Sequence, residues 1–150
     1  AIAYYKKAIT LSYKEVKCYE SLAKIYSDLK MLDSMEMVLT EGLAKFPTEE
    51  SLKKFMSICY LKQGLVFYNS GNDIKSAANK SGWNETDPEK FNAEYAKADE
   101  EFQKALPLME KSREFDVQNK NTLKALQNIY TSLKMEDKLQ QINADLENAK

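Results

Sequence analysis

The sequence feature that most constrains the fold is a six-residue segment that occurs twice. Tyr-Ser-Asp-Leu-Lys-Met at residues 26–31 returns as Tyr-Thr-Ser-Leu-Lys-Met at residues 130–135. Each copy is followed by an acidic stretch and then by apolar residues at helical spacing. Such recurrence is typical of repeat proteins, in which copies of one small unit stack and bury a shared core. The chain is therefore predicted to form the same connection between two helices at least twice.

The residue composition favours helices throughout. Only four glycines and three prolines interrupt the 150 residues, whereas Lys, Glu, Ala and Leu, which extend helices, are abundant. A hydrophobic share of 43% with 30% charged residues suits a chain that folds around its own core. We therefore predict an all-α fold of about seven helices without strands.

Residues around the first copy follow a longer pattern, in which aromatic, small and apolar residues recur at set positions: Tyr19, Leu22, Ala23, Tyr26, Met35, Leu39, Gly42 and Pro47. This pattern resembles the tetratricopeptide repeat (TPR) family, whose unit of about 34 residues contains an aromatic residue, Leu-Gly, Tyr, Ala, Phe and a closing Pro. The resemblance implies a solenoid of antiparallel helix pairs, with residues 16–49 as one regular repeat. It also implies a truncated repeat at 1–15, whose helix would carry Tyr5 and Tyr13, and a last pair at 120–150.

The second repeat is predicted to be longer than the others. Tyr60 and Tyr130 occupy equivalent positions but lie 70 residues apart, which is one repeat of 34 residues plus 36 more. Because Ala105 precedes Leu139 by one period, we place the extra residues between the two helices of a repeat at 50–119. The whole chain is then one TPR-like domain that contains one extended helical hairpin.

The first arm of this hairpin is predicted as one helix over residues 50–80, because its apolar residues keep helical spacing. The poor helix formers Asn-Ser-Gly-Asn at 69–72 leave a turn there as the alternative. Gly64 and Gly71 lie two helical turns apart on one face. The absence of a side chain at both positions predicts either a close approach of the neighbouring helix or a kink.

The second arm is predicted to begin after a break at residues 81–82. Either Thr86 or Asp87 is expected to cap it, with Glu89 reaching back in a capping box. Pro107 lies inside this arm and removes one backbone donor, so a bend is expected there.

The sequence carries no recognisable catalytic or metal-binding group. It contains no histidine, which excludes Ser-His-Asp, Cys-His and histidine-zinc arrangements. Cys18 and Cys59 lack the spacing of a metal site or of a disulfide framework. Adjacent carboxylates such as Glu100 and Glu101 point to different faces of a helix. We therefore expect a protein that is not an enzyme and that has no cofactor and no metal.

Charge and hydropathy narrow the class of partner. The net charge of −1, without a basic block, argues against nucleic acid. No apolar run approaches the roughly 20 residues of a membrane span. Bacterial proteins that resemble this chain combine such repeats with a final long hairpin and are often exported, so the resemblance allows the periplasm as well as the cytoplasm. We expect the partner to be another protein or a peptide, and the chain to be a monomer or to self-associate weakly.

The resemblance also implies which residues line a binding groove, because the first helices of TPR pairs form its concave face. The implied contacts are Lys17, Glu20 and Lys24 in the first full repeat, Lys54 and Ile58 in the second, and Lys124 and Asn128 in the last. Lys124 and Asn128 would supply half of a clamp for a peptide's terminal carboxylate. The alternative is that both belong to a solvated helix face.

Trp83 lies at the predicted tip of the hairpin, in a polar connection. It would either anchor a partner or fold back and close the tip. The leading hypothesis for function is a non-catalytic scaffold that binds a protein or peptide through the groove, the hairpin or both. The alternative is a structural role, in which the chain packs on another copy or on upstream repeats.

Overall fold

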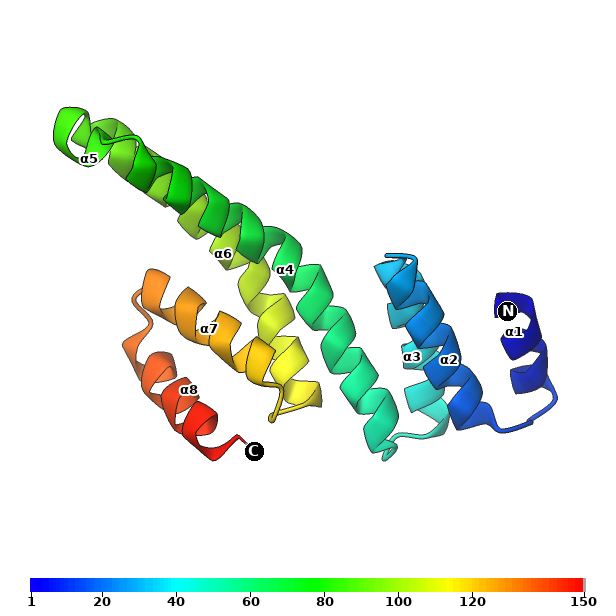
Figure 1. Ribbon diagram of the computed structural model, residues 1–150. Helices are drawn as coiled ribbons and strands as arrows, with labels where there is room; N and C mark the ends of the chain where they lie inside the picture. The colour runs from blue at the N-terminus through cyan, green and yellow to red at the C-terminus, as the bar shows by residue number, and fades with distance from the viewer. Residues whose placement is uncertain (150) are drawn as a thin grey trace. The chain divides into compact units, whose positions relative to one another are not determined.

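The computed structural model describes residues 1–149, and all regular structure within them is helical (Figure 1). The helices are α1 (Ile2–Thr10), α2 (Glu15–Asp28), α3 (Leu32–Lys45), α4 (Glu50–Lys80), α5 (Trp83–Thr86), α6 (Pro88–Phe115), α7 (Lys120–Ser132) and α8 (Glu136–Asn148). The predicted all-α class is therefore confirmed. The described residues hold one helix more than expected, because the connection between α4 and α6 forms the single helical turn α5.

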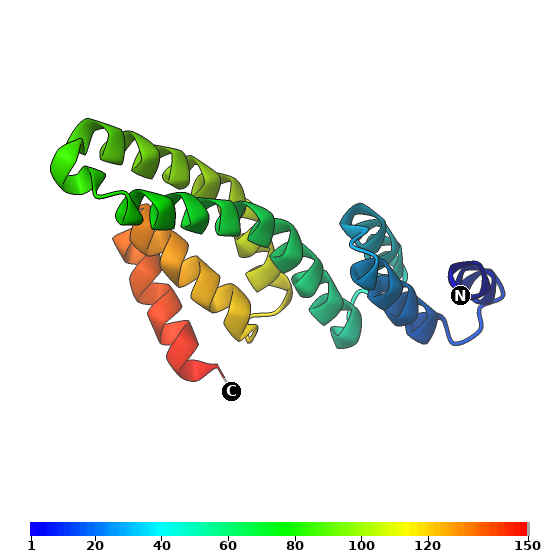
Figure 2. The ribbon, with the colours of Figure 1, turned by 45° about the horizontal axis from the view of Figure 1, so that its top comes forward.

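Packing contacts divide the chain into two compact units. The first unit covers residues 1–60, and the second begins at Leu61. The boundary lies within α4, so this helix contributes residues to both units. In the first unit α2 packs against α1 and α3, and in the second unit α7 packs against α6 and α8 (Figure 2).

The apolar faces of α2 and α3 form the core of the first unit. Tyr19 and Leu22 of α2 and Met35 and Leu39 of α3 have no exposed surface. Their spacing of three or four residues places each pair on one side of its helix. The Tyr19 hydroxyl donates a hydrogen bond to Glu41 of α3 at 2.8 Å, so the polar end of this buried ring has a partner.

The two copies of the repeated segment, 26–31 and 130–135, fold into the same turn. In each copy the lysine adopts a left-handed backbone, with φ of 58° at Lys30 and 56° at Lys134. The amide of the methionine that follows donates to the carbonyl of the tyrosine five residues earlier, at 2.8 Å in the first copy and 2.9 Å in the second. This bonding pattern ends a helix and turns the chain back. The internal repetition of the sequence is therefore a repetition of structure.

Replacing Lys30 or Lys134 by glycine is expected to raise the free energy of unfolding by about 0.5–1 kcal/mol at each position. A left-handed backbone costs an L residue about 1–2 kcal/mol, and glycine's greater freedom in the unfolded chain offsets part of this gain. Both side chains are exposed, so little packing is lost. Urea denaturation followed by circular dichroism measures the change. The control Lys24→Gly, inside α2, should lose about 1 kcal/mol, and an equal loss at Lys30 would contradict the prediction.

The helix α1 ends at Thr10, earlier than the sequence predicted. Ser12 and Lys14 both have a left-handed backbone, with φ of 52° and 45°. The Tyr13 amide donates to the Ala8 carbonyl at 3.0 Å, which closes a turn before α2 begins. The prediction that Tyr13 belongs to the first helix is therefore wrong, because this turn places it in the connection.

In the second unit, the later part of α4 and α6 run antiparallel to each other (Figure 1). The paired positions advance along α4 as they retreat along α6: Gly64 with Met109, Gly71 with Phe102, Lys75 with Asp99, and Asn79 with Tyr95. The expected close approach at the two glycines is confirmed, since a methyl group at either would lie 3.0 Å or less from the other helix. α4 is unbroken across residues 69–72, so the alternative of a turn there is wrong. Packing of its apolar face outweighs the poor helix propensity of that segment.

The start of α6 differs in detail from the prediction. Asp87 is its cap and accepts a hydrogen bond from the Lys90 amide at 3.1 Å, and a proline follows as the first helical residue. Thr86 instead closes α5, where its hydroxyl donates to the Gly82 carbonyl at 3.0 Å. The expected capping box is wrong, because the third helical residue is Lys90 and not Glu89.

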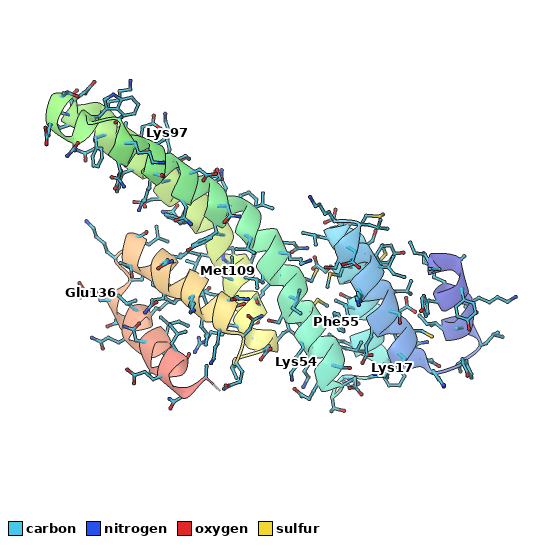
Figure 3. The ribbon with its side chains drawn as sticks, in the orientation of Figure 1. Lys17, Lys54, Phe55, Lys97, Met109 and Glu136 are labelled. Carbon is cyan, nitrogen blue, oxygen red and sulfur yellow. The ribbon has the colours of Figure 1, made fainter. Side chains whose placement is uncertain are left out.

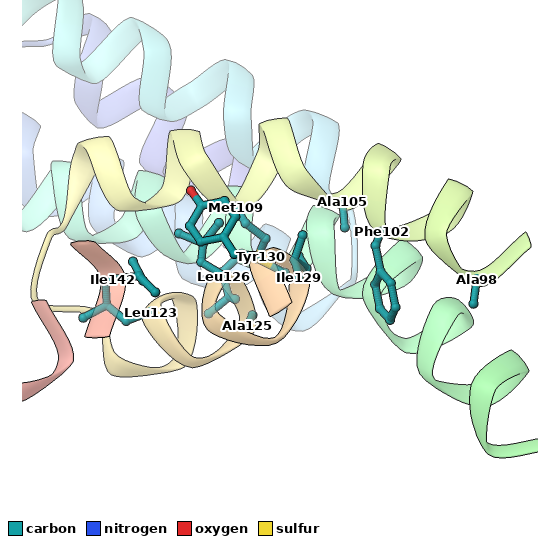
Figure 4. Packing of buried hydrophobic residues seen from close by; sticks show 11 residues of the cluster. Ala98, Phe102, Ala105, Met109, Leu123, Ala125, Leu126, Ile129, Tyr130 and Ile142 are labelled. Atoms are coloured by element: carbon teal, nitrogen blue, oxygen red, sulfur yellow. The ribbon is translucent and has the colours of Figure 1, made fainter. Parts of the chain in front are cut away.

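The core of the second unit joins the later part of α4 with α6, α7 and α8 (Figure 4). Its fully buried side chains include Phe102, Met109, Leu123, Leu126, Ile129 and Ile142. Two buried hydroxyls at the α6–α7 contact, those of Ser112 and Thr122, lie 2.7 Å apart and satisfy each other. Pro107 lies inside α6 without ending it, and the bend expected there stays a prediction.

Candidate functional site

A groove in the second unit runs between the later part of α4 and α7. The two helices line a hollow of about 260 Å³ with Leu61, Leu65 and Tyr68 from α4 and with Asn121, Lys124 and Ala125 from α7. Leu61 and Ala125 are buried and form its floor, whereas Asn121 and Lys124 are exposed. The groove therefore offers an apolar wall next to one cation and one amide, which is the usual make-up of a site that takes side chains of a partner.

A hydrogen bond between the two helices fixes one end of this groove. The Asn128 side-chain amide donates to the Tyr68 hydroxyl at 2.6 Å, although the two residues lie 60 positions apart in the sequence. The Tyr68 ring in turn packs on Phe102, with the ring centroids 5.9 Å apart. One of the two N–H groups of the Asn128 amide is thus engaged with the protein itself. Lys124 forms no ion pair with any residue of the described chain and is the available charge in the groove.

The remaining predicted groove residues lie in the first unit. Figure 3 labels Lys17 on α2 and Lys54 near the start of α4. Lys17 donates to the Glu20 carboxylate at 2.8 Å. Burial alone would raise the pKa of Glu20, but hydrogen bonds from Lys17 and Ser51 outweigh it and lower that pKa. Because Ser51 belongs to α4, the Glu20 carboxylate of α2 lies next to the start of α4.

The other three residues predicted in the first unit contribute exposed side chains. Lys24 and Lys54 are exposed and form no ion pair within the described residues. Ile58 is exposed over 37% of its surface. The structure therefore places five predicted contacts on the first unit and two on the second, where Lys124 lines the groove and Asn128 closes it.

Sequence reasoning missed part of the apolar wall of the groove. Leu65, Tyr68 and Ala125 are not among the contacts predicted from the sequence. The available signal was that Leu61, Leu65 and Tyr68 are four and then three residues apart, which places them on one side of a helix. Whether this side of α4 is covered or lines a groove depends on where α7 packs. The helical period does not reveal the position of α7.

Trp83 folds back on the tip of the hairpin instead of pointing away from it. It is half-buried, and the Lys90 ammonium lies 3.8 Å from the centroid of its ring. Its backbone amide donates to the Ser81 hydroxyl at 3.1 Å. A cation at this distance over an indole ring is a stabilising contact. Trp83 therefore takes the locally packed arrangement, which was one of the two alternatives.

Residues 1–149 hold neither a cluster of metal ligands nor a helix that could span a membrane. That part of the chain contains no group of three His, Cys, Asp or Glu side chains placed to hold a metal ion. Within the same residues, every helix is too short or too polar to cross a bilayer. Cys18 and Cys59 are buried free thiols.

Comparison with known proteins identifies no relative of the chain. It matches no family model, no curated protein and no solved structure. Its function is therefore inferred from the geometry of the chain itself.

Proposed function

We propose that this chain is a non-catalytic scaffold that holds a peptide segment of another protein in the groove between α4 and α7. The observation that carries the proposal is the pairing of an apolar wall, Leu61 and Leu65, with the unpaired cation of Lys124. A hollow of about 260 Å³ accommodates one or two side chains rather than a whole cofactor. The complementary ligand is a peptide with an apolar side chain beside an acidic one.

The hydrogen bond from Asn128 to Tyr68 bears on how such a peptide is held. One of the two N–H groups of Asn128 is engaged in this bond. Among the residues that line the groove, Lys124 is the charged group that would pair with a carboxylate of the peptide. The proposed contact is therefore a single charge beside an apolar pocket, and the two-residue clamp suggested by the family resemblance is not needed for it.

We also propose that the helix pairs of this chain are repeats of the TPR type, stacked as a solenoid. The support lies in the sequence frame of residues 16–49 and in the identical turns formed by residues 26–31 and 130–135. Arrays of this kind present extended surfaces and commonly act by binding. Repeats of the TPR type would thus agree with a role as a scaffold. The proposed groove does not depend on this family assignment.

Selection of random peptides on the immobilised full chain tests the groove. We expect the selected peptides to place an apolar residue next to Asp or Glu. Their affinity, measured by fluorescence anisotropy, should fall by about tenfold or more for Lys124→Glu and for Leu65→Glu. Lys80→Glu makes the same charge change at an exposed position outside the groove and should leave the affinity unchanged.

Circular dichroism of each variant shows whether it has kept its helices, so that a loss of binding is not mistaken for unfolding. Peptides that bind Lys124→Glu and Leu65→Glu as tightly as the unchanged chain would exclude this groove as the binding site.

A further inference from the structure

The first unit carries a second hollow, which the proposed groove does not use. It measures about 280 Å³ and is lined by Tyr4, Lys7, Ala8, Leu11 and Tyr13, a set that we call the α1 patch. Three of its apolar side chains are largely exposed, Tyr4 at 67%, Leu11 at 69% and Tyr13 at 56%. Single exposed apolar residues are common on proteins, but three that line one hollow indicate a contact surface.

The α1 patch is preformed by the helix and by the turn that follows it. Leu11 directly follows α1, and its amide still donates to the Lys7 carbonyl at 3.2 Å, so it lies two turns beyond Tyr4 on the same side. Tyr13 is fixed beside them, because its amide donates to the Ala8 carbonyl at 3.0 Å and its carbonyl accepts from the Cys18 thiol at 3.4 Å. A surface that is already ordered loses little conformational entropy when a partner docks.

Two lysines lie at the α1 patch, Lys7 in its lining and Lys14 beside the Tyr13 ring. Both are exposed, and neither forms an ion pair with another described residue. Lys14 lies 5.5 Å from the centroid of the Tyr13 ring. None of the 23 acidic residues of the chain lies in residues 1–14. The charge that complements these lysines is negative.

The helix α8 differs from α1 in its outer side. Its exposed residues include Glu136, Asp137, Gln140 and Glu147. No large apolar side chain of α8 is strongly exposed within the described residues. The exposed apolar cluster is therefore a property of the α1 patch and not of every outer helix face of this chain.

We propose that the α1 patch docks an amphipathic helix of another protein, one whose apolar stripe is flanked by acidic residues. Apolar side chains spaced three, four and seven residues apart on the partner would pack against Tyr4, Leu11 and Tyr13. Glutamates or aspartates beside that stripe would pair with Lys7 and Lys14. The α1 patch belongs to the first unit and the groove to the second. The chain would therefore bind two classes of partner at two separate surfaces.

Two synthetic probes test the docking of a helix on the α1 patch. The first is an 18-residue amphipathic helix with a leucine stripe flanked by glutamates, and the second carries lysine at every glutamate position. Fluorescence anisotropy with the full chain should show binding of the acidic probe and about tenfold or more weaker binding of the basic one. Leu11→Glu should weaken binding of the acidic probe by about tenfold or more.

Matched variants show whether binding of the acidic probe depends on the α1 patch. Met37→Glu makes the same kind of change at an equally exposed apolar position, 68% exposed on α3, and should leave binding unchanged. Lys124→Glu, which tests the groove, should also leave it unchanged. Equal binding of both probes, or full binding by Leu11→Glu, would overturn the proposal. Self-association of the chain that Leu11→Glu abolishes would also overturn it, because a second copy would then be the occupant.

Discussion

Replacing Phe102 by alanine is expected to lower the free energy of unfolding of the second unit by about 3–5 kcal/mol. The Phe102 ring is 1% exposed and lies where α4 and α6 meet. It packs against the ring of Tyr68, lies directly over Gly71, and has the Lys75 ammonium 5.0 Å from its centroid. Removal of the ring would leave a cavity that helices held at this distance cannot close.

Urea denaturation followed by circular dichroism measures this loss. Val66→Ala, on the same hairpin but 63% exposed, is the matched control and should change the stability by no more than about 0.5 kcal/mol. A loss of less than about 1 kcal/mol for Phe102→Ala would mean that the hairpin does not depend on this contact.

The second large effect is expected at the glycine that faces the same ring. A methyl group at Gly71 would lie 2.8 Å from one carbon of the Phe102 ring and 3.0 Å from two others. The ring is buried and stiff, so it cannot move aside, and overpacking of this kind costs about 1–3 kcal/mol. Gly71→Ala is therefore expected to destabilise the protein, although alanine normally favours a helix over glycine by about 1 kcal/mol.

Gly64 provides the matched control for this substitution, because it lies on the same face of α4, two turns earlier. Its nearest neighbour is the flexible end of Met109, at 3.0 Å, which can rotate away. Gly64→Ala should therefore change the stability by less than about 1 kcal/mol. In a Phe102→Ala background the clash at Gly71 is absent, so Gly71→Ala should become neutral or stabilising there. A loss of the same size in both backgrounds would show that the ring is not the cause.

The hairpin arms and their glycines show which structural features local sequence patterns can predict. The apolar stripe over residues 50–80 was sufficient to predict one helix through Asn-Ser-Gly-Asn, and α4 is unbroken there. The position of Gly64 and Gly71 on one face predicted the close approach to α6. These predictions succeed because helical period, glycine and turn residues act within a few positions of the sequence.

The predictions that failed depend on competition between neighbouring residues. Thr86 and Asp87 could both cap the next helix, and the choice was decided by α5, which engages the Thr86 hydroxyl. Tyr13 fitted a helical stripe, but a turn stabilised by its own amide ends α1 before it. Sequence patterns do not resolve such choices, because both options satisfy the same local preferences.

The candidate groove shows more clearly what sequence patterns cannot predict. Lys124 and Asn128 were named from the resemblance, whereas Leu65 and Tyr68 were not recognised as groove residues. The hydrogen bond from Asn128 to Tyr68 spans 60 residues and ties one of the predicted residues to the wall of the groove. Likewise, the position of Lys90 over Trp83 decided between the two arrangements considered for the tip.

The sequence by itself determined the helical class, most of the helix boundaries and the recurrence of one turn at 26–31 and 130–135. Only the tertiary structure decided which helix faces meet, and therefore which side chains line the groove and which form the α1 patch. The physical reason is that periodicity and caps act over one or two helical turns. The pairing of helices depends instead on packing between residues far apart in the chain, and that packing determines which apolar faces are covered and which remain available for a partner.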